Sequence, residues 1–318
     1  PTLRRQRQMC IRDSLQKAAV QIAVSIGGAT AGQLDFSGLR ETESLHIRGH
    51  ERSALLSEHL HSIGRLPLLR SLRFRSLTLP SLTALQPATL QTVRLSYCTL
   101  ADLALPDSPH MAEVEVDSCD HPEALALQLG GARHARLELN KARTLSHVSG
   151  LERLEELELS AWTLRDATPL MRAISQAPLQ SLTLGDLFGG ATLAGLASPS
   201  LRTLTIKRSG LTSLAGLQAA ALETVTVDGA PVVDVAALMD CPALKRLHMR
   251  RCKGSPSLSA LKDHPTLQRV NLIDMPHVTP ADVPDGVPVS WNRHAIMERQ
   301  KPAEVVEGSL LSGWSTLR

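Results

Sequence analysis

One rhythm of apolar positions recurs along most of the chain. In the stretch LQTVRLSYCTL the apolar residues stand at steps of three, two, three and two, at Leu90, Val93, Leu95, Cys98 and Leu100. A helix would space such residues at 3.6, and a half-buried strand would alternate them strictly. The stretch therefore predicts a short strand that is followed by a turn, rather than one continuous element.

Copies of this rhythm return at nearly constant intervals. They begin near residues 69, 90, 111, 134, 154, 179, 201, 222, 244 and 267, separated by 20 to 25 residues, and an earlier copy starts at Thr42. A fixed period of this length is the signature of a stacked repeat protein. The series predicts a solenoid in which each copy forms one rung.

Each copy places two apolar residues two positions apart, so both face the same side of a short strand. The connections are long enough for the next strand to return parallel to the last, with a right-handed crossover. Beyond the strand, apolar steps of three predict 3₁₀ turns. Residues 53–63 and 166–175 carry helical patterns and predict two short helices.

The pattern L-x-x-L-x-L-x-x-(N/C)-x-L over roughly residues 40–280 resembles the leucine-rich repeat family. The resemblance implies an α/β solenoid: a right-handed leucine-rich-repeat horseshoe of about 11 rungs, with a parallel β-sheet on the concave face and 3₁₀ or short helices on the convex face. In place of the family's usual asparagine at the eighth offset, this chain has Leu77, Cys98, Cys119, Ala142, Trp162, Leu187, Ser209, Ala230, Cys252 and Met275. We expect these side chains to be buried and the turn amides to bond to backbone or water.

The ends of the chain read differently from the repeats. RQRQMCIRDS, residues 5–14, resembles translated sequencing-adapter read-through, so we expect residues 1–14 to be an artefact. We expect an N-terminal cap at 15–41, repeats at 42–280, a C-terminal cap at 281–300 with an edge strand at 287–291, and a tail or linker at 301–318, since open solenoid ends need covers.

Composition narrows the class of partner. The formal charge is +3, but residues 1–14 hold four Arg and one Asp, which leaves 34 − 4 = 30 basic and 31 − 1 = 30 acidic residues. The remaining chain is neutral, which removes the charge argument for a polyanionic partner. No stretch of 18 apolar residues occurs, so we expect no membrane span.

The five cysteines form no C-x-x-C pair, and their spacing indicates neither a zinc site nor a disulfide framework. Cys98 and Cys119 share one offset on adjacent rungs, where a disulfide is geometrically conceivable. The family resemblance favours free thiols, which would suit a reducing cytosol, either the protein's own or that of a host.

The exposed strand positions, read as columns across the rungs, are basic first, acidic in the middle, then hydroxyl-rich, then basic again. This assignment places Glu138 in the central column beside Glu115 and Glu158. One interpretation is that these charges form a merely solvated face. Stacked like charges cost stability, however, which favours the other interpretation, a surface shaped for a partner of complementary charge. The predicted partner-binding residues are Arg48, Arg73, Arg75, Arg94, Tyr97, Glu115, Asp117, Glu138, Glu158, Lys207, His248 and Arg250.

The sequence therefore predicts a non-catalytic module that binds a partner protein on its concave face. No nucleotide-binding, hydrolase or metalloprotease motif is present, and we expect no cofactor, metal or small-molecule substrate. An acidic middle would repel a nucleic-acid backbone, so a nucleic-acid partner is the weakest reading. Two finer hypotheses stay open: a bacterial secreted effector, to which PADVPDGVPVSW bears a slight resemblance, and the recognition half of a ubiquitin-ligase-type effector whose catalytic domain is absent from this chain.

Overall fold

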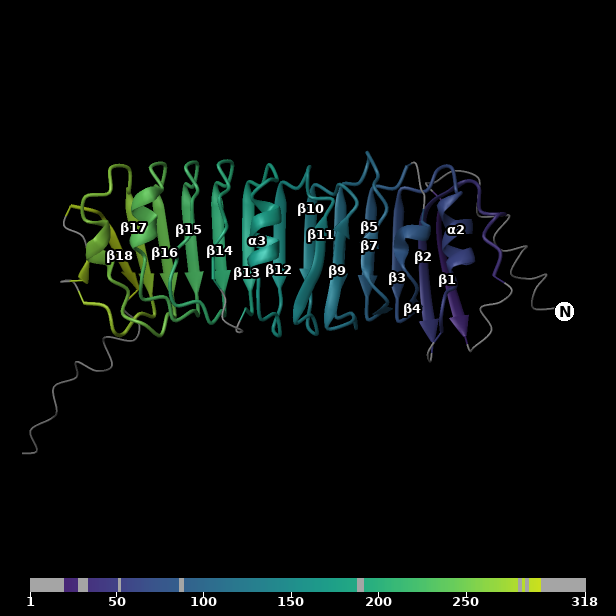
Figure 1. The fold of residues 1–318 in the computed structure, drawn as a ribbon, viewed down its shortest axis with the longest axis horizontal. Coiled ribbons are helices and arrows are strands. Elements are labelled where there is room, and N and C mark those ends of the chain that lie inside the picture. Colours follow the sequence, from purple (N-terminus) through teal and green to yellow (C-terminus); the bar gives the residue numbers. More distant parts are fainter. Residues whose placement is uncertain are drawn as a thin grey trace, which may run out of the picture.

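A single long parallel sheet organises the protein. The computed structural model describes residues 20–27, 34–50, 53–85, 89–187, 192–279, 282–283 and 286–292. Figure 1 shows the main-sheet strands side by side along the longest axis, in the order in which they follow one another in the chain. The predicted artefact at 1–14 and the tail at 301–318 lie outside the described residues.

The main sheet contains 13 strands among the described residues, and every neighbouring pair is parallel. In order across the sheet they are β1 (Val20–Gly27), β2 (Thr42–His50), β3 (Ser71–Arg75), β5 (Thr92–Ser96), β8 (Glu113–Asp117), β10 (His134–Glu138), β12 (Glu156–Ser160), β13 (Ser181–Gly185), β14 (Thr203–Lys207), β15 (Thr224–Asp228), β16 (Arg246–Arg250), β17 (Arg269–Ile273) and β18 (Val289–Asn292). The edge strand predicted at 287–291 is present as β18.

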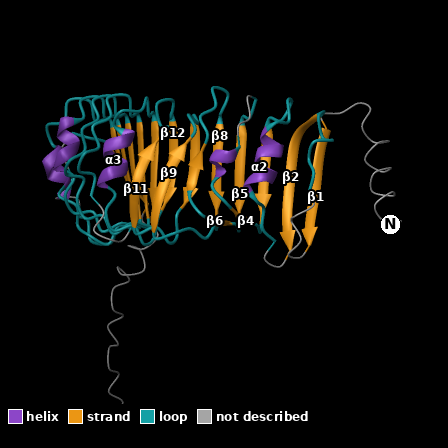
Figure 2. Ribbon diagram, turned by 45° about the vertical axis from the view of Figure 1, so that its right-hand side comes forward, coloured by secondary structure: helices purple, strands orange, loops and turns teal. Residues whose placement is uncertain are grey.

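A second layer covers one side of this sheet. It holds the three-stranded sheet β7 (Leu103–Leu105), β9 (Ala124–Leu129) and β11 (Thr144–Ser149), the short pair β4 (Thr78–Leu79) and β6 (Thr99–Leu100), the helices α2 (Ser57–Gly64) and α3 (Thr168–Ile174), and the 3₁₀ turns η2 (Leu82–Ala84), η3 (Ala236–Asp240) and η4 (Leu258–Leu261). Figure 2 shows α2, α3, β9 and β11 on the same side of the main sheet. The two predicted helices are confirmed as α2 and α3. The other side of the main sheet is open, and we call it the concave face.

The core lies between the two layers and is almost entirely aliphatic. Each repeat strand buries two residues two positions apart, such as Val93 and Leu95, which are fully buried. Removing such side chains from water is the main favourable term in folding. The apolar rhythm of the sequence is thus the inward-facing half of each rung.

The turn after each strand is held by backbone bonds from rung to rung. The Tyr97 amide donates to the Asp117 carbonyl at 3.0 Å, and the Arg208 amide donates to the Asp228 carbonyl at 2.7 Å. Sulfur atoms supplement this ladder, because the amides of Cys98 and Cys252 donate to Cys119 Sγ and Met275 Sδ, each at 3.3 Å. The amides of Tyr97 and Arg208 bond to the backbone as expected, whereas those of Cys98 and Cys252 use sulfur, which the sequence did not predict.

Two rungs correct the register predicted from the sequence. Residues of β10 pair with β8 so that Ala135 lies opposite Val114 and Leu137 opposite Val116. The copy therefore begins at buried Ala132, not at His134, which is exposed.

The same shift moves the surface residues of this rung. Arg136, not Glu138, occupies the central column opposite Glu115 and Glu158, and Glu138 lies in the next column opposite Ser160.

The prediction that Trp162 is buried at the eighth offset is also wrong. Ala161, one residue earlier, is fully buried instead, and Trp162 is 53% exposed. A tight inter-rung position accepts a methyl group more readily than an indole, because overpacking a filled core costs stability. The other nine residues expected in this column are buried, although the start at Ala132 places the half-buried Asn140, not Ala142, at the eighth offset of its rung.

Candidate protein-binding surface

A hollow of about 330 Å³ opens on the concave face over β8, β10, β12, β13 and β14. It sits toward the C-terminal ends of these strands, where the chain leaves the sheet. Its lining residues are Glu115, Val116, Asp117, Arg136, Leu137, Glu138, Glu158, Leu159, Ser160, Trp162, Thr183, Gly185, Asp186, Lys207 and Arg208.

Gly185 is the residue that leaves room for the hollow. It lies at the end of β13, between Ser160 and Lys207 in the same column. A Cβ atom at this position would meet nothing closer than 3.7 Å, and the glycine does not have a positive φ. Neither packing nor backbone conformation therefore requires glycine here, although glycine within a strand costs about 0.5–1 kcal/mol relative to alanine.

Most acidic residues around the hollow are matched by cations. Glu158 lies 3.6 Å from both Arg136 and Lys207, measured between carboxylate oxygen and cationic nitrogen. Glu115 lies 3.3 Å from Arg94 by the same measure, and Arg94 also bonds Glu113 at 3.1 Å. The acidic band predicted from the sequence is thus interrupted by arginines, and its cross-strand pairs are stabilising rather than repulsive.

Asp117 and Glu138 are the exceptions in this lining. Among the described residues neither forms an ion pair with a lysine, arginine or histidine, and the undescribed segment 188–191 contains no charged residue. Each accepts one short-range side-chain bond within the described residues: the Ser118 hydroxyl donates to Asp117 at 3.1 Å, and the Asn140 amide donates to Glu138 at 2.8 Å. One part of the hollow therefore keeps uncompensated negative charge.

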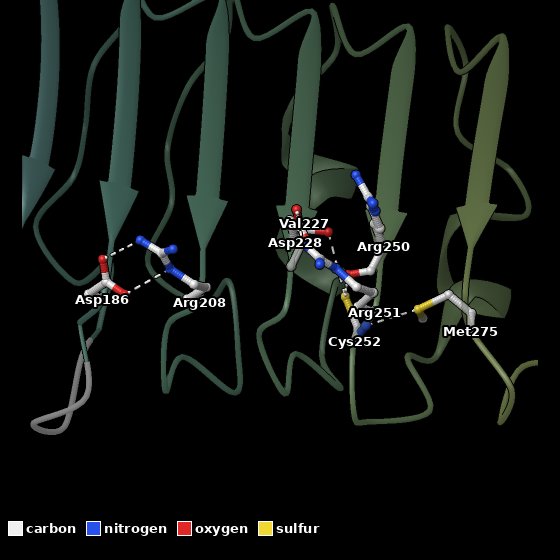
Figure 3. A network of polar contacts seen from close by, with 8 residues as sticks. All are labelled: Asp186, Arg208, Val227, Asp228, Arg250, Arg251, Cys252 and Met275. Atoms are coloured by element: carbon white, nitrogen blue, oxygen red, sulfur yellow. Dashed lines mark hydrogen bonds and ion pairs between the residues drawn. The ribbon is translucent and has the colours of Figure 1, made fainter.

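An ion pair between a buried carboxylate and an exposed arginine forms another part of the lining. The Asp186 carboxylate, whose side chain is 4% exposed, accepts two bonds from the Arg208 guanidinium at 2.9 and 3.0 Å and one from the Ser160 hydroxyl at 2.7 Å. Figure 3 shows this pair just past the ends of two adjacent strands, and further along the sheet it shows Asp228, the last residue of β15, beside Arg251, which follows β16. The bonds to Asp186 raise the pKa of Arg208. A fully bonded buried carboxylate is held in one geometry, so this part of the lining is preorganised.

The predicted partner-binding residues fall into three places on the concave face. Glu115, Asp117, Glu138, Glu158 and Lys207 line the hollow. A second group lies toward the N-terminal end of the sheet, on β2, β3 and β5 and in the turn after β5: Arg48, Arg73, Arg75, Arg94 and Tyr97. The third group, His248 and Arg250, lies on β16.

Electrostatics distinguishes the two outer groups from the hollow. The guanidinium of Arg75 lies 5.3 Å from the centre of the Tyr97 ring, a cation–π contact. Burial, and then the charges of Arg73, Arg75 and Arg48, lower the pKa of His46 in the N-terminal group. Burial, followed by Arg246 and Arg269, lowers the pKa of His248. Both outer groups are therefore basic surfaces that keep their histidines neutral near pH 7.

Besides the core residues Val116, Leu137 and Leu159, the hollow is lined by seven residues that the sequence did not predict as partner-binding: Arg136, Ser160, Trp162, Thr183, Gly185, Asp186 and Arg208. Arg136 was hidden by the register error, and Trp162 by its assignment to the core. The signal that could have pointed to Gly185 is its type, because a glycine inside a strand often marks the close approach of a ligand or another backbone.

Metal-ligand clusters, reactive cysteines or a membrane-spanning helix would point to other functions of the described part of the chain. No group of three or more His, Cys, Asp or Glu residues there could hold a metal ion. Cys98, Cys119, Cys241 and Cys252 are buried free thiols, and burial raises the pKa of Cys241 to about 11. Within those same residues no helix is long and apolar enough to cross a membrane.

Comparison with solved structures identifies the architecture. The internalin InlF of Listeria monocytogenes strain 4b F2365 superposes with a TM-score of 0.53 and 16% sequence identity, over 89% of this chain and 88% of that one. The chain is a leucine-rich-repeat solenoid. At this identity the likeness concerns the fold alone.

A second structural match and the sequence comparisons give little further information about this protein. The structure titled as a TLR13–ssRNA13 complex matches with a TM-score of 0.31 and 15% identity, over 82% of this chain and 48% of that one. That likeness is too slight to support an argument. No protein-family model matches the sequence, and no curated protein matches it.

Proposed function

We propose that this leucine-rich-repeat solenoid is a protein-binding module, and that the hollow beside Gly185 receives a side chain of the partner. The observation that carries the proposal is a glycine that neither its own packing nor its own backbone requires, at the centre of a polar hollow on an open sheet. A fold alone does not fix a ligand, so the proposal rests on this site.

The surroundings of the hollow suit a binding surface. Arg136 and Trp162 both line it, and tryptophan and arginine are the residue types that most often dominate binding energy at protein interfaces. The strands around it are paired on both sides, so the site is carried by rigid elements rather than by loops. A partner would meet a preformed surface with little ordering of this chain.

Filling the hollow tests the proposal. Valine suits a strand, and its Cβ at residue 185 would meet only ordinary contacts, so we expect Gly185→Val to leave the thermal midpoint unchanged or raised. Wild type and variant are each used to select from a phage library that displays random 12-residue peptides. We expect wild type to enrich peptides that Gly185→Val does not bind, with Gly185→Ala intermediate.

The control for this selection is Thr226→Val, on the same face of β15 but outside the hollow. It should bind the selected peptides as wild type does. Peptides that bind wild type and Gly185→Val equally would remove the hollow from the function.

Two finer predictions from the sequence accompany this proposal, namely delivery as a bacterial effector and service as the recognition half of a ubiquitin ligase. A translocation reporter fused to the chain, read in the host cytoplasm, tests the first. A longer reading frame that continues past Arg318 into a ligase domain tests the second.

A further inference from the structure

The charges around the hollow limit the chemistry of its occupant. Its lining contains three cations, Arg136, Lys207 and Arg208, and all three are already engaged by Glu158 or Asp186. An anionic group entering the hollow would meet cations whose charge is already balanced by these carboxylates. Of the five acidic residues in the lining, Asp117 and Glu138 alone lack a cation within the described part of the chain.

Asp117 and Glu138 stand side by side. Leu137 of β10 lies opposite Val116 of β8, and Glu138 and Asp117 are the residues that directly follow them. Adjacent strands are about 4.8 Å apart. Two carboxylates at such neighbouring positions repel each other, and a cation placed between them would convert the repulsion into attraction.

We infer, as an extension of the proposed function, that the partner side chain in the hollow is an arginine that bridges Asp117 and Glu138. A guanidinium has five N–H donors in a planar fork and can bond two carboxylates at once, whereas an ammonium is a compact point charge. Asp117 and Glu138 each accept one local bond, from Ser118 and Asn140, which orients them and leaves acceptor positions open.

The rest of the hollow suits the aliphatic part of an arginine. Gly185 leaves space above the sheet, and Trp162, 53% exposed, contributes apolar surface at the same site. An arginine buries its methylene stem against apolar surface while its head group reaches polar partners. A bare metal ion fits less well, because no group of three metal-binding side chains exists among the described residues.

The experiment uses the peptides that bind wild type but not Gly185→Val. We expect them to share an arginine at one position. Replacing it by citrulline, which keeps the shape but removes the charge, should weaken Kd roughly ten-fold or more, because charge-assisted bonds are lost. Replacement by lysine should weaken Kd by less.

Matched protein variants localise this effect. Asp117→Asn with Glu138→Gln keeps both shapes, and we expect it to weaken the arginine peptide about as much as citrulline does, with no further loss when the two changes are combined. The control is Glu152→Gln with Glu156→Gln, which removes the same charge from exposed residues that do not line the hollow. It should leave Kd nearly unchanged at 0.15 M salt.

The outcomes separate this inference from the proposed function. Peptides that depend on Gly185 but share no arginine, or that tolerate citrulline, would overturn the arginine assignment and leave the protein-binding function standing. Equal affinity for lysine and arginine would overturn the bridging geometry. Failure to find any Gly185-dependent peptide would overturn both.

Discussion

The rungs of β10 and β12 differ from the rungs that flank them at one position, the residue directly after the strand. In the flanking rungs this residue adopts a left-handed conformation with φ of 45–55° and lies at the surface or beside an ion pair, as at Ser76, Tyr97, Ser118, Asp186, Arg208, Arg251 and Asp274. After β10 and β12 it is Leu139 or Ala161, which have no positive φ and are fully buried. One position of the repeat is thus an apolar core position in one region and, apart from the buried carboxylate of Asp186, a surface position in the other.

The backbone bond at this position is the same in both regions. The Leu139 amide donates to the Ser160 carbonyl at 2.7 Å, and the Arg251 amide donates to the Ile273 carbonyl at 3.0 Å. The rung-to-rung bond is therefore independent of where the side chain points. What differs is the energetic role of that side chain, which mutation can measure.

The largest expected contrast comes from truncating this side chain. Leu139→Ala should lower the free energy of unfolding by about 2–5 kcal/mol, because it removes a fully buried leucine and leaves a cavity. Arg251→Ala, which breaks a partly exposed ion pair with Asp228, should cost about 1 kcal/mol or less. Urea titration measures both. Similar losses would show that the two regions do not differ in this way.

Glycine at the same position should act with opposite sign in the two regions. Ser76→Gly relieves a left-handed serine and should stabilise the protein by up to about 1 kcal/mol, reduced by the greater freedom of the unfolded chain. Ala161→Gly removes a buried methyl group from an extended position and should destabilise by about 1 kcal/mol. Thermal midpoints compare them directly, and shifts of the same sign would contradict the distinction.

The smallest expected effect is a dependence of stability on pH that arises from His248 in the flanking region. The pKa of His248 is lowered by burial, Arg246 and Arg269, and the Asn271 amide donates to its Nδ1 at 2.7 Å, in the tautomer that carries its proton on Nε2. The unfolded chain therefore takes up a proton first, so stability falls as pH drops below about 6.5, the ordinary histidine value.

His248→Gln should reduce this fall, as measured by urea midpoints at pH 7.5 and 5.5. His46, whose pKa is also lowered, should retain its share. A variant whose midpoint falls with acid as steeply as that of wild type would exclude His248 as a contributor.

The sequence predicted the features that recur and missed those that depend on a single rung. Ten spaced copies of one pattern predict strands, inward residues and order in the sheet. In the copy near 134 the pattern offers Ala132 and Ala135, small residues with a weak signal, and His134 was taken as its start. That error of two residues moved Glu138 into the central column and hid Arg136.

The hollow itself could not be predicted from patterns of apolar residues. It depends on a side chain that is missing at Gly185, on the mutual position of Asp117 and Glu138 across two strands, and on Ala161 rather than Trp162 filling the inter-rung space. Each of these is a relation between rungs and requires the register to be known. The sequence shows the residue types, but it does not show which residues lie beside one another on adjacent rungs.

The ladder of turn amides makes the backbone structure of this protein independent of the side chains after its strands. Tyrosine, aspartate, arginine, leucine and alanine all stand at the residue after a strand, and in each case the amide still reaches the next rung. Residues at this position can therefore be exchanged without moving the rungs, because the backbone bond does not depend on the side chain. A lineage of such chains could change partners through a few substitutions, at Gly185 among other positions, while keeping the same fold.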